Sequence, residues 1–176
     1  EFITMKIEQL FTGCLAEMTY YIESNGEAAV VDPLRETAPY IQMAEADEAK
    51  IKYIFLTHFH ADFVSGQYDL ARKTGARIIF GPNATAEYNI YNGADGEDFF
   101  VGKGKITLLH TPGHTMESSS YLITDEDGNT PCILTGDALF IGDVGRPDLA
   151  VKEDALTEED LAGHLFDSLR NKIMTL

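Results

Sequence analysis

The chain has 176 residues, of which 44% are hydrophobic and 24% charged, a balance typical of one globular domain and not of a disordered chain. Its 13 Lys and Arg residues against 29 Asp and Glu residues give a formal net charge of −16, which disfavours nucleic acids and anionic membranes as partners. The two cysteines, Cys14 and Cys132, are too few for a disulfide framework and fit a reducing cytoplasm, the expected location. Neither is expected to be catalytic, and Cys132 is expected to be buried.

The first half of the chain is expected to alternate short apolar strands with helices. Strands are predicted over 5–11, 18–23, 28–32, 51–56 and 78–80. Helices are predicted over 37–49, from a cap at Ser65 to Thr74, and over 84–91.

The second half is richer in strands, which are predicted over 99–101, 106–110, 119–124 and 132–135. A capping box of Thr157 and Asp160 predicts a closing helix over 157–174, with its buried face formed by Leu161, Leu165, Phe166, Leu169 and Ile173. This order predicts sheets covered by helices on their outer faces, and neither a Rossmann fingerprint nor a Walker A motif occurs. Residues 1–4 precede Met5 and are expected to be a remnant foreign to the native protein, so the domain is assigned to 5–176.

The histidines follow strands. His58, His60 and Asp62 stand at alternate positions directly after the apolar strand 51–56, which places three ligand-type side chains on one side of the backbone. Two imidazoles and a carboxylate within five residues suit a divalent metal ion.

Two further strand ends carry ligand-type residues. Thr111-Pro112-Gly113-His114 turns sharply after one strand, and Gly136-Asp137 follows another. Because rigid strands can hold such side chains at one sheet edge, we expect His114 and Asp137 to join the metal site. We expect His110 to be a strand residue and His164 a surface residue of the last helix.

These motifs resemble those of the metallo-β-lactamase superfamily, which has His-x-His-x-Asp-His after one strand, Thr-Pro-Gly-His after another and Gly-Asp after a third. The resemblance spans roughly residues 5–175. It implies an α+β fold, an αββα sandwich with a metal site at one edge of its two sheets. It also implies that the chain is cut at its C-terminal end and lacks the family's last strand, which carries another histidine.

One position departs from the family pattern. Phe63 stands where the family has the last histidine of its first motif, and phenylalanine cannot bind a metal ion. The second metal site of binuclear members would therefore keep only Asp62 and Asp137, a weak pair for zinc. The first site keeps His58, His114 and Asp137, while His60 either adds a fourth ligand or supports the others from behind.

Three segments, 57–66, 115–119 and 140–149, are similar to the persulfide dioxygenase branch, in particular to its bacterial forms fused to rhodanese domains. That branch implies one Fe(II) per chain, with zinc as the alternative metal. It also implies oxidation of glutathione persulfide, or a related small persulfide, to sulfite with O₂, an activity of sulfur metabolism and hydrogen sulfide detoxification. Rhodanese domains beyond Leu176 are expected as partners, and a homo-oligomer is left open.

Two residues are expected to assist the metal. Asp62 is expected to accept a hydrogen bond from a ligand imidazole. Arg146 is expected either to hold a substrate carboxylate or to pair with Asp143 or Asp148.

The first alternative function is a binuclear zinc hydrolase of the glyoxalase II or lactamase type, which Phe63 disfavours. The second is a truncated scaffold domain without catalysis.

Overall fold

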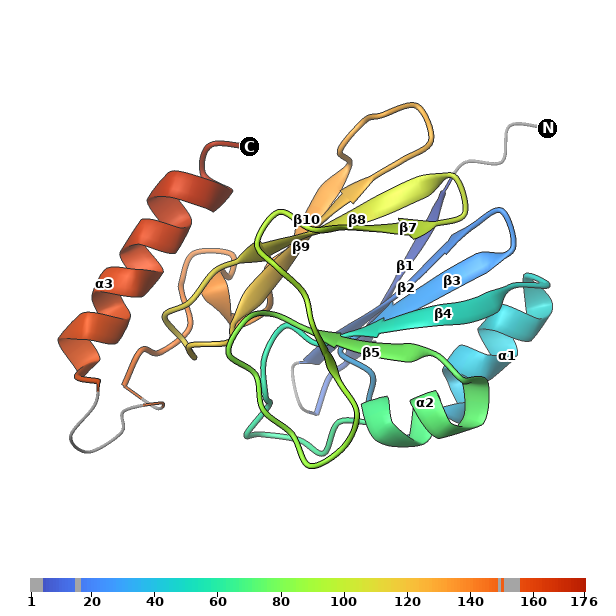
Figure 1. Ribbon diagram of the computed structural model, residues 1–176, viewed down its shortest axis with the longest axis horizontal. Helices are drawn as coiled ribbons and strands as arrows, with labels where there is room; N and C mark the ends of the chain where they lie inside the picture. The colour runs from blue at the N-terminus through green and yellow to red at the C-terminus, as the bar shows by residue number, and fades with distance from the viewer. Residues whose placement is uncertain (1–4, 15–16, 149, 151–155) are drawn as a thin grey trace.

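The structure is a computed structural model that describes residues 5–14, 17–148, 150 and 156–176. Residues 1–4, assigned above to a foreign remnant, lie outside this part. Two β-sheets pack face to face, and helices cover the outer face of each (Figure 1). The predicted αββα sandwich is therefore confirmed.

The larger sheet has six strands in the order β1-β2-β3-β4-β5-β6. The first three are antiparallel, whereas β4, β5 and β6 run parallel to β3. The strands are β1 (Lys6–Thr12), β2 (Glu17–Ser24), β3 (Glu27–Val31), β4 (Lys50–Phe55), β5 (Arg77–Phe80) and β6 (Tyr91–Asn92).

The smaller sheet is antiparallel throughout and has the order β10-β9-β8-β7. Its strands are β7 (Asp98–Val101), β8 (Gly104–His110), β9 (Ser119–Thr124) and β10 (Cys132–Leu134). The apolar core between the two sheets includes Phe55 and Tyr121, whose ring centroids are 4.8 Å apart.

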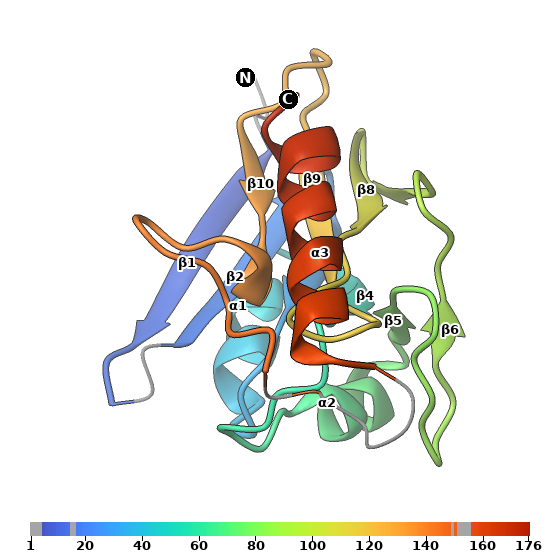
Figure 2. The same ribbon diagram turned by 90° about the vertical axis from the view of Figure 1, so that its left-hand side faces the viewer.

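Helices α1 (Ala38–Ala46) and α2 (Gln67–Thr74) lie on the outer face of the larger sheet and bury Tyr40, Ala44 and Leu70 against it. Helix α3 (Glu158–Ser168) continues into one π-helical turn (Leu169–Ile173) and lies across β9 and β10 (Figure 2). The capping box of Thr157 and Asp160 is confirmed. Among the described residues, no helix combines the length and apolar character needed to cross a membrane.

The strand directions bring several loops to one edge. Strands β3 and β4 are parallel, with Val31 beside Phe55, so the residues that follow them, Asp32 and Thr57, are neighbours. The amide of Thr57 donates to Asp32 Oδ1 (2.8 Å). The amide of Ser119 in turn donates to the carbonyl of Thr57 (2.8 Å), which joins the two sheets at this edge.

Three local predictions are wrong. The helix predicted over 84–91 does not form. Residues 84–90 are a loop, and the Asn92 side chain stabilises it by donating to the carbonyls of Gly81 (3.2 Å) and Ala84 (2.8 Å). Ser65 does not cap α2, which begins after Gly66; its hydroxyl donates to the carbonyl of Pro33. Phe166 is 63% exposed, because the buried stripe of α3 is narrower than the sequence period indicated.

Candidate metal centre

Three of the predicted ligands come together at this edge. The ligand atoms of His58, His114 and Asp137 lie within 4.8 Å of one another. His58 follows β4, His114 lies between β8 and β9, and Asp137 lies in a short 3₁₀ turn after β10. His114 Nε2 is 3.5 Å from Asp137 Oδ2, and the rings of His58 and His114 are perpendicular with centroids 4.9 Å apart.

The imidazoles of His58 and His114 each make a hydrogen bond through Nδ1. Nδ1 of His58 is 3.0 Å from the hydroxyl of Thr57, and Nδ1 of His114 is 2.9 Å from the carbonyl oxygen of Arg146. Because a carbonyl can only accept, Nδ1 of His114 is the donor to Arg146, and Nε2 is the ring nitrogen that faces Asp137. Such partners fix the tautomer and orientation of a metal-binding histidine.

His60 belongs to a different group. Its Nε2 lies 3.0 Å from Asp32 Oδ1, and its ligand atom falls within 4.8 Å of those of Glu17 and Asp32. The ring of Phe63 packs on the His60 imidazole, with centroids 4.4 Å apart. His60 therefore faces the carboxylate of Asp32, and the cluster of His58, His114 and Asp137 forms without it.

Burial and charge act differently on the two neighbouring histidines. Burial, together with the charge of His60, lowers the pKa of His58 to about 3, so His58 is the neutral imidazole that metal binding requires. Burial also opposes the charge on His60, but the carboxylate of Asp32 overcomes it and raises the pKa of His60 to about 9. Burial, with a contribution from the charge of Asp32, raises the pKa of Glu17 to about 7.

Two glycines allow the Asp137 turn to approach its neighbours. Gly136 has a φ of +50°, and a Cβ there would lie 2.6 Å from the Thr57 side chain. A Cβ on Gly145 would overlap the carbonyl oxygen of Asp137, which accepts a hydrogen bond from the Gly145 amide (2.9 Å). Larger residues at either position would push Asp137 away from the two histidines.

Helix α3 holds the loop that carries His114. The hydroxyl of Ser168 donates to the carbonyl of Pro112 (2.8 Å). Lys172 Nζ donates to the carbonyl of His110 (2.7 Å) and pairs with Asp95 (2.6 Å). These contacts fix both ends of the short segment between β8 and His114.

Of the two residues expected to assist the metal, Asp62 departs from the expectation and Arg146 matches one of its two alternatives. Asp62 is exposed, and its side chain makes no hydrogen bond to another described residue; the ligand imidazoles use Thr57 and the Arg146 carbonyl instead. The expected hydrogen bond from a ligand imidazole to Asp62 is therefore wrong. The Arg146 side chain is 69% exposed and its guanidinium pairs with Asp148, as one of the two alternatives had it.

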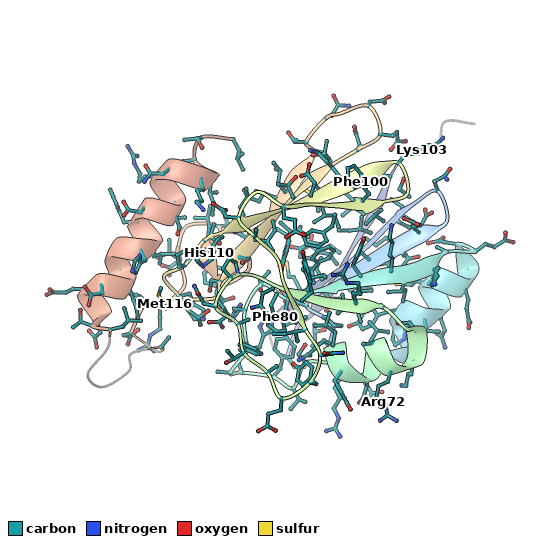
Figure 3. The ribbon with its side chains drawn as sticks, in the orientation of Figure 1. Arg72, Phe80, Phe100, Lys103, His110 and Met116 are labelled. Atoms are coloured by element: carbon teal, nitrogen blue, oxygen red, sulfur yellow. The ribbon has the colours of Figure 1, made fainter. Side chains whose placement is uncertain are left out.

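The remaining histidines and cysteines lie outside the cluster. His110 Nε2 is 2.8 Å from the carbonyl of Met116, and both residues lie toward α3 (Figure 3). His164 is exposed on α3. Cys132 is half-buried rather than buried, because it lies in the edge strand β10, and burial raises the pKa of its thiol.

Sequence reasoning missed Asp32 and Glu17. Asp32 directly follows the apolar strand β3, so the strand-end argument applied to the histidines could have found it. Its buried carboxylate accepts from both the amide and the hydroxyl of Thr57, at 2.8 and 2.7 Å. No motif marks Glu17, which reaches the group only through the pairing of β2 with β3.

The donor set fits a divalent metal ion. Two imidazoles and one carboxylate from three separate loops form the two-histidine, one-carboxylate arrangement used by non-haem Fe(II), and zinc accepts the same donors. His58, His114 and Asp137 would hold the ion.

Comparisons with known proteins identify the family. The family model described as "Metallo-beta-lactamase superfamily" matches residues 12–172. The cytoplasmic hydroxyacylglutathione hydrolase of Arabidopsis thaliana is 33% identical over 138 residues, which cover 76% of this chain and 53% of that protein. The hydroxyacylglutathione hydrolase of Klebsiella pneumoniae is 30% identical over 125 residues, covering 70% of this chain and 47% of the relative. The chain thus spans about half the length of these curated relatives.

Two solved structures are similar over nearly the whole chain. A metallo-β-lactamase from Staphylococcus aureus has a TM-score of 0.83 at 34% identity, covering 95% of this chain and 52% of that one. ETHE1 from Myxococcus xanthus has a TM-score of 0.82 at 30% identity, covering 98% of this chain and 71% of that one. The fold, the His and Asp cluster at the sheet edge and these matches together make the chain a member of the metallo-β-lactamase superfamily.

Proposed function

We propose that this protein is a mononuclear iron persulfide dioxygenase, which oxidises glutathione persulfide or a similar small persulfide to sulfite with O₂. The observation that carries the proposal is the division of the ligand-type residues. His58, His114 and Asp137 form one three-ligand cluster, whereas His60 is paired with Asp32 outside it. Three ligands on one face leave open positions for both an anionic sulfur and O₂.

The surroundings of the cluster favour one metal over two. Phe63 offers no ligand atom, and its ring covers His60. Among the described residues, Glu17 and Asp32 form a separate group with His60. For a second ion beside the first cluster, the family pattern leaves Asp62, which is exposed, and Asp137, which already belongs to that cluster. A site of that composition would hold a second zinc ion weakly.

The chain's own residues position the reaction. Bound Fe(II) would supply the redox chemistry and the open positions for the sulfur and oxygen atoms. The Thr57 hydroxyl and the Arg146 carbonyl fix the ligand imidazoles, and Gly145 sets the distance to Asp137. The Arg146 guanidinium, exposed beside Asp148, is the proposed contact for a substrate carboxylate, which would have to displace or bridge that ion pair.

The similarity to the ETHE1 structure supports the dioxygenase, and the resemblance of segments 57–66 and 140–149 points the same way. The curated relatives named hydroxyacylglutathione hydrolase support the alternative, a binuclear zinc hydrolase of thioesters. His60 is the residue on which the two proposals differ. The hydrolase would require His60 to leave Asp32 and join the metal ligands.

The test begins with metal content. Protein produced in medium with balanced iron and zinc, and purified without oxygen, is expected to hold about one iron per chain, as one three-ligand cluster requires. Oxygen uptake with glutathione persulfide and hydrolysis of a glutathione thioester are then measured on the same sample. Asp137→Ala is expected to lose the iron and the oxygen uptake, whereas Asp62→Ala is expected to keep the iron.

Three other outcomes would contradict the proposed dioxygenase. Near two zinc ions per chain with thioester hydrolysis would favour the hydrolase. A folded protein without metal would favour the scaffold. Full retention of iron in Asp137→Ala would contradict the ligand assignment itself.

A further inference from the structure

A concave site is formed by residues outside the cluster of His58, His114 and Asp137. It is a pocket of about 460 Å³ between α2, the start of β5 and the segment that leads into β6. Arg77 begins β5 on this side, whereas Phe80 ends it beside Phe59 of the metal-binding loop, with ring centroids 4.4 Å apart. Figure 3 shows Arg72 projecting from α2, far from His110 and Met116.

The rim of this pocket is cationic on a protein of net charge −16. Arg72 and Arg77 both line it, and no carboxylate of the described residues lies within 4.0 Å of either guanidinium. Glu97, which contacts the rim through Tyr91, accepts from the Tyr91 hydroxyl (2.8 Å) and from the amide of Ala94 (2.8 Å). The two arginine charges are therefore available to a ligand.

The arginines are also held in a suitable position. Cζ of Arg77 lies 4.3 Å from the centroid of the Tyr91 ring, and Cζ of Arg72 lies 5.9 Å from that of Tyr68. A guanidinium that lies over an aromatic face keeps its N–H edge free. That edge matches two phosphate oxygens at once.

The rest of the pocket suits a flat, partly apolar body. Ile78, which is 5% exposed, lines the pocket together with Ala71 of α2 and Ala76, which follows that helix. Tyr68 and Tyr91 add aromatic surface. Asn89 is exposed on the rim, and an asparagine amide can pair with the N6 and N7 atoms of adenine. A volume of about 460 Å³ is within the usual range for a small-ligand site.

We propose that this pocket binds an adenine nucleotide, with the phosphates on Arg72 and Arg77 and the base between the tyrosines and Asn89. The cationic rim selects for a phosphate, the apolar lining for an organic body, and the amide for adenine. The site is separate from the metal centre and does not depend on the activity proposed for it.

The test is calorimetric titration of the intact protein at low ionic strength. ADP is expected to bind with a dissociation constant of about 10–100 μM, whereas adenosine and inorganic phosphate are each expected to bind at least about tenfold more weakly. The double variant Arg72→Gln/Arg77→Gln is expected to weaken ADP binding by about 30-fold or more. Asn89→Leu is expected to reduce the preference for ADP over uridine diphosphate.

A matched control separates the pocket from general electrostatics. Lys103→Gln/Arg170→Gln makes the same change in net charge at two residues that do not line the pocket, one between β7 and β8 and one after α3, and is expected to leave ADP binding unchanged. All substituted side chains are exposed, so each variant is expected to keep the melting curve of the native protein.

Four results would overturn the proposal. They are no ADP binding at millimolar concentration, phosphate binding as tightly as ADP, adenosine binding as tightly as ADP, and an equal loss of binding in the control double variant. The second would reduce the pocket to an anion site, and the last would reduce it to a long-range charge effect.

Discussion

The imidazole of His60 lies 3.0 Å, Nε2 to Oδ1, from the carboxylate of Asp32, and the side chains of both are about 95% buried. Asp32 also accepts two hydrogen bonds from Thr57, whose hydroxyl lies 3.0 Å from Nδ1 of His58. A single buried carboxylate thus lies beside His60 and accepts from Thr57, whose hydroxyl contacts His58, so it links the surroundings of both histidines of the His-x-His motif.

This pair predicts a stability change at alkaline pH in metal-free protein. The pKa of His60 is raised from 6.5 to about 9, so the pair stabilises the fold fully below pH 6.5 and the contribution is lost as the pH rises through 9. The loss is up to about 3 kcal/mol. Urea unfolding at pH 6 and pH 9.5 measures it, and His60→Gln is expected to flatten the difference. His164→Gln, on the exposed face of α3, is the control and should behave as the native protein; the same flattening there would contradict the assignment.

Phe63→His is expected to create a second metal site. The new imidazole would stand beside Asp62 and within the loop that also carries His60, so zinc content should rise from about one to about two ions per chain in zinc-rich medium. Val64→His, one residue along the same exposed loop, is the matched control and should leave the content near one. Unchanged zinc in Phe63→His would show that something other than this ring limits the site to one metal.

Gly145→Ala is expected to weaken the metal centre. The added Cβ meets the carbonyl of Asp137, and the forced shift costs about 1–3 kcal/mol of unfolding free energy. Metal affinity, measured by competition with a chelator, should fall about 10- to 100-fold. Gly163→Ala has open space around it within α3 and should instead stabilise the fold by about 0.5–1 kcal/mol. Native affinity in Gly145→Ala would mean that Asp137 tolerates the shift.

Lys172→Met is expected to loosen the loop that carries His114. It removes the hydrogen bond to the His110 carbonyl and the ion pair with Asp95, which together join α3 to the end of β8. We expect about a tenfold loss of metal affinity with about 1 kcal/mol of lost stability, since the pair is partly exposed. Lys103→Met, whose side chain forms no ion pair with a described residue, controls for loss of charge. Equal affinities in the two variants would show that α3 does not act on the site.

The sandwich and the three residues of the His58, His114 and Asp137 cluster can be predicted from the sequence, whereas Asp32 and Glu17 cannot be recognised by a motif. Local apolar runs, such as 51–56, mark the strands. His58, His114 and Asp137 can be predicted as ligands because each stands in a loop that follows such a strand. The helix start at Thr157 was also local, since a capping box satisfies its own backbone groups within four residues. The helix predicted over 84–91 was wrong because hydrogen bonds from the Asn92 side chain stabilise a loop there.

Which histidine faces which carboxylate depends on contacts between strands that are far apart in the sequence. His58 and His60 are equivalent by spacing, but β3 lies beside β4 and brings Asp32 to His60, while β10 brings Asp137 to His58 and His114. Asp32 lies 28 residues before His60, and Asp137 lies 77 residues after it. The pairing of strands far apart in sequence therefore sets the partners and charge of each imidazole, which residue type and spacing do not specify.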